Sequence, residues 1–171
     1  MTQGELYERD PEAWNAYLAE GNAKQPRKRV SADILLRDEH GRILLVDPAY
    51  KPDWDLPGGM AEANESPAEA VRRELREELG LDVTVGSLLC VDWVSPHEPW
   101  DDLINFIFDG GILSGEAISD LRLVDRELRA FEFCDESQAK ERLRPYVWRR
   151  ISVALEALEN GRARYVEDGH A

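Results

Sequence analysis

Three glutamates on one predicted helix carry the strongest chemical signal in this chain. Glu74 and Glu78 are four residues apart and Glu77 lies between them, so their carboxylates fall on adjoining parts of one helical surface. Carboxylates at this spacing repel each other by roughly 0.2–0.5 kcal/mol per pair, and a hard divalent cation with oxygen ligands offsets that repulsion. The pattern predicts a site for Mg²⁺, for which Mn²⁺ is the expected substitute. The alternative is that the glutamates form the solvated face of an amphipathic helix.

The helix that carries these glutamates has a well-marked beginning and end. Ser66 is a good N-cap, Pro67 suits the first helical position, and Glu69 completes a capping box. Gly80 is a natural end for the helix. Four apolar residues fall on one stripe that can pack against a sheet: Ala68, Val71, Leu75 and Leu79. We therefore expect the glutamates on a rigid helix whose neighbouring face is buried.

Fixed spacings extend this pattern over residues 59–81. Gly59 is followed after five residues by Glu65, and after seven more by the run from Arg73 to Leu81, RELREELGL. The stretch resembles the Nudix box, the signature of the Nudix hydrolase family, at every specified position. The resemblance implies an α/β/α sandwich with a mixed central sheet. It also implies an Mg²⁺-dependent pyrophosphohydrolase, in which water attacks phosphorus in a nucleoside diphosphate linked to a second group, X.

The residues of the box receive roles from their chemistry and from this resemblance. Glu74, Glu77 and Glu78 are the predicted metal ligands, and the carbonyl group of Gly59 is expected to complete the site, as it commonly does in the family. The predicted catalytic residues are Glu74, Glu77 and Arg73. Either glutamate would activate the attacking water, and Arg73 would orient a carboxylate through bidentate hydrogen bonds. Several acidic residues stay open: Glu65 for metal binding, and Glu98, Glu116 and Glu127 for the general base.

Aromatic and basic residues outside the box are the predicted substrate contacts. The polar, proline-rich residues 95–102 form the expected specificity loop, and Trp93 and Trp100 near its two ends could stack on a nucleobase. Each tryptophan taken alone also fits a structural role. For the basic residues that end at Arg29, a solvated linker is favoured and phosphate contact is the alternative. The full set of predicted substrate-binding residues is Arg29, Arg37, Trp54, Trp93 and Trp100.

The substrate class rests on weaker signals. Pro96 lies about fifteen residues beyond the box, a feature of the family's ADP-ribose hydrolases, so ADP-ribose or a nucleotide sugar is favoured. An (oxidised) nucleoside triphosphate is the main alternative. A non-catalytic nucleotide-sensing domain would be expected to carry a damaged box. A prenyl or inositol diphosphate would call for a greasy pocket with little stacking surface.

Length and charge limit the remaining possibilities. A chain of 171 residues is expected to form one domain, residues 1–171, large enough for a hydrophobic core. Its net charge of −14 opposes binding to nucleic acids and to anionic membranes, so a small-molecule nucleotide is the expected partner. The N-terminus has no apolar signal core, and Cys90 and Cys134 lie in apolar runs without metal-ligand spacing. We therefore expect a cytoplasmic protein with buried, reduced thiols.

The order of the predicted elements agrees with a sheet between helices. Residues 1–29 are predicted to be a loose start, a helix from residue 11 to 21 and a linker, and residues 135–171 two helices and a tail. An aromatic stripe on the first helix, from Trp14 to Leu18, is expected to pack on its own domain. The alternatives are packing over the substrate entrance or on a second subunit, which would give a homodimer. The predicted strands are 30–36, 42–46, 83–85, 88–94, 103–108 and 130–134, and residues 109–127 are expected to be irregular. This order suggests a mixed sheet covered on both faces.

Overall fold

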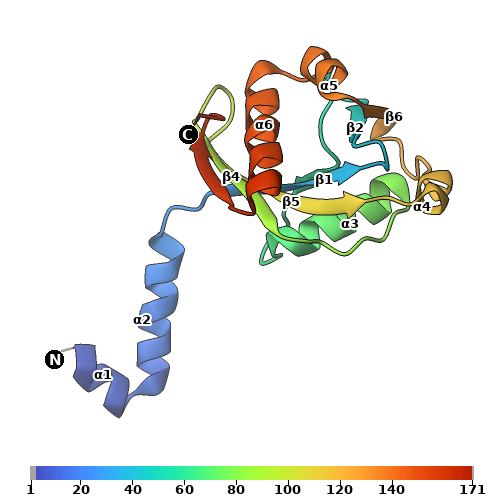
Figure 1. The fold of residues 1–171 in the computed structure, drawn as a ribbon. Helices are drawn as coiled ribbons and strands as arrows, with labels where there is room; N and C mark the ends of the chain where they lie inside the picture. The colour runs from blue at the N-terminus through green and yellow to red at the C-terminus, as the bar shows by residue number, and fades with distance from the viewer. Residues whose placement is uncertain (1–2, 171) are drawn as a thin grey trace.

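The computed structural model describes residues 3–170, which form a mixed β-sheet with helices on both faces (Figure 1). The strands are β1 (Arg29–Arg37), β2 (Ile43–Pro48), β3 (Gly58–Met60), β4 (Leu88–Val94), β5 (Leu103–Ile112), β6 (Leu128–Cys134) and β7 (Arg164–Glu167). The helices are α1 (Gln3–Arg9), α2 (Pro11–Lys24), α3 (Pro67–Leu79), α4 (Gly115–Asp120), α5 (Glu136–Arg142) and α6 (Pro145–Asn160). The predicted α/β/α sandwich with a mixed sheet is confirmed.

Strand β1 lies at the centre of the sheet and has partners on both edges. The strand order is β6-β2-β1-β5-β4-β7, and β3 also pairs with β1. The pairs β1–β5 and β4–β7 are parallel and the others are antiparallel. Because β5 runs along one edge of β1, strands β2 and β3 share the other edge, with β3 beside residues 31–33. Gly58 and Gly59 are thereby fixed next to the middle of the sheet.

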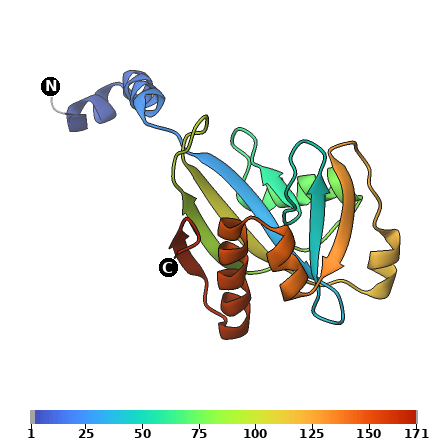
Figure 2. The ribbon, with the colours of Figure 1, turned by 90° about the horizontal axis from the view of Figure 1, so that it is seen from above.

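Two hydrophobic clusters attach the helices to the sheet. Consecutive residues of a strand point to opposite faces, so Ile34 of β1 belongs to one cluster and Leu35 to the other. Helix α3 packs on the first face through Val71, Leu75 and Leu79. The second face is covered by α5 and α6, which lie over the sheet in Figure 2. The free thiols of two cysteines, Cys90 and Cys134, are buried in this second cluster.

Helix α3 begins and ends where the sequence predicted. Ser66 accepts a hydrogen bond from the backbone N–H of Glu69, and the Glu69 side chain accepts one from the backbone of Ser66, which confirms the capping box. Gly80 takes the left-handed conformation at the C-cap, with φ of 64°. The buried residues of α3 include Val71, Leu75 and Leu79 of the predicted stripe.

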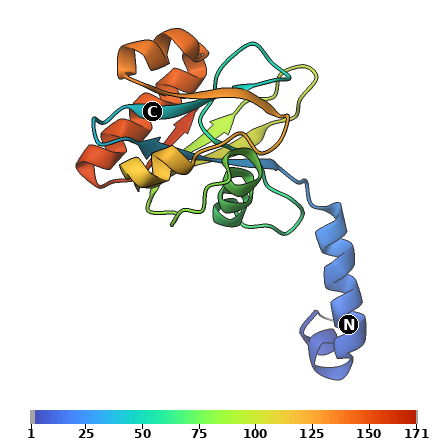
Figure 3. The same ribbon diagram turned by 90° about the vertical axis from the view of Figure 1, so that its right-hand side faces the viewer.

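The N-terminal helices α1 and α2 project from the sandwich, as Figure 3 shows. The prediction that the first residues are loose is wrong for the described part, because Gln3–Arg9 are helical, and α2 continues past Gly21 to Lys24. The prediction that the aromatic stripe packs on its own domain is also wrong. Helix α2 has no buried residue, and the Trp14 ring instead contacts Tyr7 and Tyr17, at centroid distances of 6.0 and 5.4 Å. In α1 and α2 the aromatic rings therefore contact each other and are not buried against the sandwich.

Other differences concern short segments whose state depends on distant partners. Residues 83–85 were predicted to be a strand but have no strand partner, and residues 109–127 contain the end of β5 and α4 rather than only irregular chain. Strands β3 and β7 were not predicted, because three or four residues show no clear period of their own. No helix within residues 3–170 has both the length and the apolar character needed to cross a membrane.

Candidate active site

Arg73 organises the acidic surface of α3. Its Nε and Nη2 atoms donate to the two carboxylate oxygens of Glu65, both at 3.0 Å, and Nη1 donates to Glu74 at 2.9 Å and to Glu77 at 3.1 Å. Nη2 also donates to the carbonyl oxygen of Met60 at 3.0 Å. These hydrogen bonds hold the pKa of Glu65 below its ordinary value and raise that of Arg73 above its usual range. The predicted orienting role of Arg73 thus has a geometric basis, and Glu65 is its bidentate partner.

Of the three box glutamates on α3, Glu74 and Glu77 are bound by Arg73 and Glu78 is not. Its side chain is only 7% exposed, and its Oε2 atom is buried without a hydrogen-bond partner among the described residues. Burial, followed by the charge of Glu74, raises the pKa of Glu78 to about 8, although a hydrogen bond from the backbone of Gly58 opposes the shift. A buried polar atom without a partner is costly and calls for an explanation. A cation at this position would provide one.

Gly59 allows the carboxylate of Glu74 to lie against the backbone of β3. A Cβ atom at position 59 would come within 2.5 Å of Glu74 Oε1, closer than side-chain contacts allow. At Gly58, where φ is +140°, a Cβ atom would lie 2.2 Å from the carbonyl oxygen of Ala32. Gly58 is therefore required for the close approach of β3 to β1, whereas a side chain at position 59 would displace the carboxylate of Glu74. Burial is also the leading cause that raises the pKa of Glu74.

The oxygen donors at this junction fit a hard divalent cation, although they are not arranged as a finished site. No group of three or more His, Cys, Asp or Glu side chains within residues 3–170 could hold a metal ion as it stands. Arg73 binds Glu74 and Glu77, while the Oε2 atom of Glu78 has no hydrogen-bond partner among the described residues. The unpaired oxygen of Glu78 and the cradle for Glu74 at Gly59 match the chemistry of Mg²⁺. The full ligand set of Gly59, Glu74, Glu77 and Glu78 stays a prediction.

A cavity of about 360 Å³ opens beside these residues, and Gly58, Gly59 and Glu78 form part of its wall. Two predicted substrate contacts, Arg29 and Trp100, also line it. The guanidinium carbon of Arg29 lies 4.6 Å from the centre of the Trp100 ring, a cation–π contact, and this tryptophan is 55% exposed.

Three other predicted substrate contacts do not line this cavity and have partners elsewhere. Trp54 stacks with the guanidinium of Arg142, at 4.6 Å. The indole nitrogen of Trp93 donates to Asp102 at 2.8 Å, and Arg37 forms an ion pair with Asp109 at 3.1 Å. Structural contacts account for these three side chains, and their proposed substrate roles stay untested predictions.

Sequence reasoning missed a group of polar residues at the cavity wall: Ser31 and Asp33 of β1, Asn105 of β5 and Arg150 of α6. Burial, then the nearby charge of Asp55, raises the pKa of Asp33 to about 7. Asn105 donates to Asp33 Oδ2 at 2.7 Å and to Ser31 Oγ at 2.8 Å. The sequence signal that could have found two of them is a polar residue next to apolar ones: Asp33 before Ile34 in β1, and Asn105 between Ile104 and Phe106 in β5.

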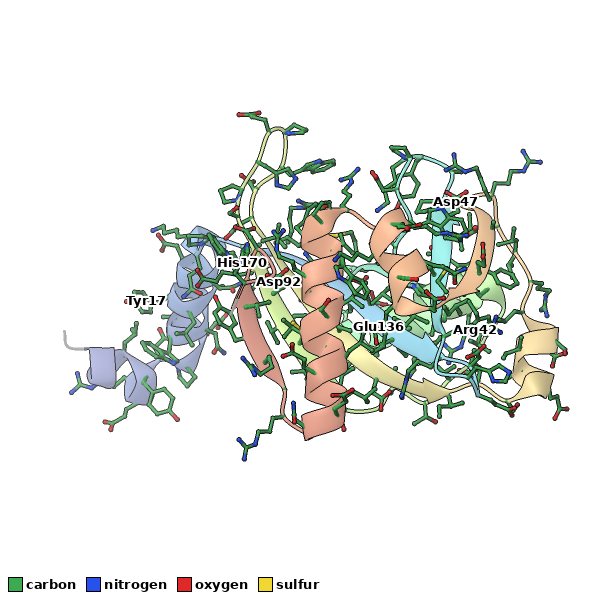
Figure 4. The ribbon with its side chains drawn as sticks, turned by 45° about the horizontal axis from the view of Figure 1, so that its top comes forward. Tyr17, Arg42, Asp47, Asp92, Glu136 and His170 are labelled. Carbon is green, nitrogen blue, oxygen red and sulfur yellow. The ribbon has the colours of Figure 1, made fainter. Side chains whose placement is uncertain are left out.

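Arg150 reaches the cavity from α6 and is held by a buried ion pair. Its Nε atom donates to Asp92 of β4 at 2.6 Å, and the two side chains are 7% and 0% exposed. The other oxygen of Asp92 accepts from the backbone N–H of Gly169 at 3.1 Å. Figure 4 shows Asp92 and His170 close together beside α6. The carboxylate of Asp92 therefore connects the backbone at Gly169, near the C-terminus, to Arg150 at the cavity wall.

Comparisons with known proteins agree with this geometry. The chain is 41% identical over 56 residues to an 8-oxo-dGTP diphosphatase of Proteus vulgaris, which covers 30% of this chain and 50% of that protein. It is 35% identical over 90 residues to an ADP-ribose pyrophosphatase of Methanocaldococcus jannaschii, covering 51% of this chain and 53% of that protein. The chain thus spans about half the length of these curated relatives.

The fold matches that of solved structures as well. A structure described as a UDP-X diphosphatase has a TM-score of 0.69 at 20% identity, with coverage of 95% of this chain and 80% of that one. Identity at this level supports the fold alone. The family model described as NUDIX domain matches residues 27–154, which is most of the chain. With the intact box on α3 and the same sandwich around it, this chain belongs to the NUDIX domain family.

Proposed function

We propose that this chain is a divalent-metal-dependent pyrophosphohydrolase that cleaves a nucleoside diphosphate linked to a group X. The observation that carries the proposal is the buried, unpaired Oε2 atom of Glu78, which lies at the wall of a cavity large enough for part of a nucleotide. Arg73 holds the neighbouring carboxylates of Glu74 and Glu77 in fixed positions, so a cation can bind to a partly ordered set of oxygen atoms.

The reaction is attack of water on phosphorus, with release of a nucleoside monophosphate and the phosphorylated X group. A divalent cation, when bound, supplies charge neutralisation for the phosphoryl oxygens and acidity to water. The protein's own contribution is to position the diphosphate against β3 and to remove a proton. Glu78, Glu74 and the carbonyl group of Gly59 would hold the cation. Arg73 would keep Glu74 from turning away, through its hydrogen bond of 2.9 Å.

Among the three general-base candidates, we favour Glu127 for its charge near the box glutamates. Its charge contributes to the raised pKa values of both Glu74 and Glu78, so its carboxylate lies within electrostatic reach of the two. Its backbone carbonyl accepts from the N–H of Ala49 at 2.6 Å, which anchors the loop next to β2. Glu98, Glu116 and Glu127 are all exposed, so exposure does not separate them; Glu98 and Glu116 are not among the leading charges that act on Glu74 and Glu78. We therefore assign proton removal to Glu127.

ADP-ribose or a nucleotide sugar remains the favoured substrate class, and an (oxidised) nucleoside triphosphate is the second candidate. The relatives named above include proteins described for ADP-ribose and for 8-oxo-dGTP, which supports both candidates equally. The favoured class is supported by the position of Pro96 and by a cavity of about 360 Å³ that has room beyond a diphosphate.

The test is a substrate panel with Mg²⁺ and with Mn²⁺: ADP-ribose, nucleotide sugars, nucleoside triphosphates and 8-oxo-dGTP. Products are separated by chromatography, and labelled water identifies the attacked phosphorus atom. Glu78→Gln should abolish metal-dependent turnover, whereas Glu159→Gln on the exposed face of α6 is the matched control and should leave it unchanged. Turnover by Glu78→Gln at the wild-type rate, or no turnover of any compound with either metal, would contradict the proposal.

A further inference from the structure

The side chain of Asn105 combines deep burial with one unused hydrogen-bonding atom. Asn105 lies in the middle of β5, is only 2% exposed, and is part of the cavity wall. Its amide nitrogen donates to Ser31 Oγ at 2.8 Å and to Asp33 Oδ2 at 2.7 Å. Its amide oxygen is buried and has no partner among the described residues.

The two hydrogen bonds fix which end of the amide remains for a ligand. An amide nitrogen has two N–H donors, and here one points to Ser31 and the other to Asp33. Only the oxygen is left, and it can only accept. Leaving such an acceptor unpaired away from water is unfavourable, and native proteins rarely do so without a reason. The free position therefore suits a ligand that donates an N–H or O–H.

The hydrogen-bonding character of Asn105 disfavours the phosphate end of a nucleotide at this position. Asp33 and Asp55 also line the cavity, and the charge of Asp55 acts on Asp33. Arg150 and Lys51 line the cavity too and act on Asp33, so charge alone does not decide; phosphate oxygens, however, only accept hydrogen bonds and gain nothing from the amide oxygen of Asn105. We therefore place the diphosphate beside Glu78, where a bound cation would neutralise its charge, and the nucleobase or a sugar beside Asn105.

A nucleobase with an exocyclic amino group can bond both to the acceptor and to the donor on this wall of the cavity. Its amino group donates to Asn105, and a ring nitrogen or carbonyl oxygen of the same base can accept from Arg150, whose charge also reaches Asp33. Asp92 holds Arg150 in place, so donor and acceptor are both fixed before a ligand binds. Aromatic rings of Trp100 and Tyr146 at the same cavity offer apolar surface for the base.

We propose that Asn105, held by Ser31 and Asp33, is a specificity-determining residue that accepts a hydrogen bond from the amino group of adenine, guanine or cytosine. The inference rests on the proposed nucleotide substrate and narrows its base. Hypoxanthine and uracil carry a carbonyl group where adenine and cytosine carry the amino group. Placed against Asn105, that carbonyl oxygen would face another acceptor, and the enzyme rejects these bases.

The experiment compares amino-bearing and keto partners of otherwise identical compounds. The pairs are ADP-ribose against its deaminated hypoxanthine analogue, and CTP against UTP. For the full chain with Mg²⁺, kcat/KM for the amino compound should exceed that for its keto partner by about tenfold or more, because a buried polar group left unpaired discriminates strongly. Asn105→Leu should remove the preference by slowing the amino compound. Ser31→Ala, which keeps the amide oxygen and its anchor on Asp33, should retain most of the preference, and the exposed variant Glu159→Gln is the matched control.

Binding without turnover separates this inference from the proposed reaction. Calorimetry with AMP against IMP, and with CMP against UMP, should give the same preference in wild-type protein and its loss in Asn105→Leu. Tighter binding of AMP and CMP without any hydrolysis would reject the reaction and keep the inference. Equal affinities within each pair would overturn the inference whether or not hydrolysis occurs, and so would equal kcat/KM values where it does. If Asn105→Leu does not fold, the wild-type pairs alone decide.

Discussion

Replacing Glu78 with glutamine removes the least favourable ionisable group of the proposed site and should stabilise the metal-free fold at alkaline pH. The pKa of this acid is raised from 4.5 to about 8. The fold therefore gains stability from a protonated Glu78 at low pH, and this contribution is lost as the pH rises from 4.5 through about 8. At about 1.4 kcal/mol per pKa unit, the full shift corresponds to about 5 kcal/mol. Glutamine keeps the shape without the titrating proton.

Two effects reduce the measured gain in stability of Glu78→Gln over wild type. The amide N–H₂ of glutamine would occupy the position of the unpaired Oε2 atom, and an unpaired buried donor costs about 1–3 kcal/mol. Glu74, whose charge is the second cause of the shift, can also take up a proton and relieve part of the repulsion. We therefore expect the stability difference between variant and wild type to grow by at least about 2 kcal/mol between about pH 5.5 and pH 8.

The assay is chemical denaturation in urea with a chelator, for wild type, Glu78→Gln and the exposed control Glu159→Gln, at a series of pH values. The control should follow wild type at every pH, because Glu159 is exposed on α6. Adding Mg²⁺ should then stabilise wild type and not Glu78→Gln, since only a carboxylate gains from the cation. A Glu78→Gln variant that is less stable than wild type by the same amount at all pH values would refute the reasoning.

Three further changes test other parts of the site. Arg73→Lys cannot bind Glu65 through two parallel hydrogen bonds, so kcat should fall by about 10- to 100-fold with little change in melting temperature. The control Arg76→Lys, on the exposed side of the helix, should change neither kcat nor the melting temperature. Gly59→Ala places a Cβ atom 2.5 Å from Glu74 Oε1, so the Mg²⁺-induced rise in melting temperature should shrink, and an unchanged rise would reject the cradle. Asp92→Asn leaves the guanidinium of Arg150 buried without its charge partner, and the free energy of unfolding should fall by about 3–5 kcal/mol; a loss below about 1 kcal/mol would contradict a buried pair.

Several parts of the fold were predictable because their causes are local. The capping box of Ser66 and Glu69, the left-handed Gly80 and the apolar stripe of α3 all depend on residues within a few positions of each other. Local residues likewise mark the start of α5, which Asp135 caps, and of α6, which begins at Pro145. Short strands such as β3 and β7 exist only because a distant strand lies beside them, which no local pattern indicates.

The sequence by itself determined the family, the helix that presents the glutamates and the cation chemistry that they favour, because spacing along a helix fixes which side chains share a surface. Only the tertiary structure decided how these groups are used. It assigned Glu65, eight residues from Arg73, as the bidentate partner of that arginine, and it left Glu78 as the unpaired acid. It also brought Asn105 to Asp33 across 72 residues, since neighbouring strands of a sheet meet whatever their separation along the chain.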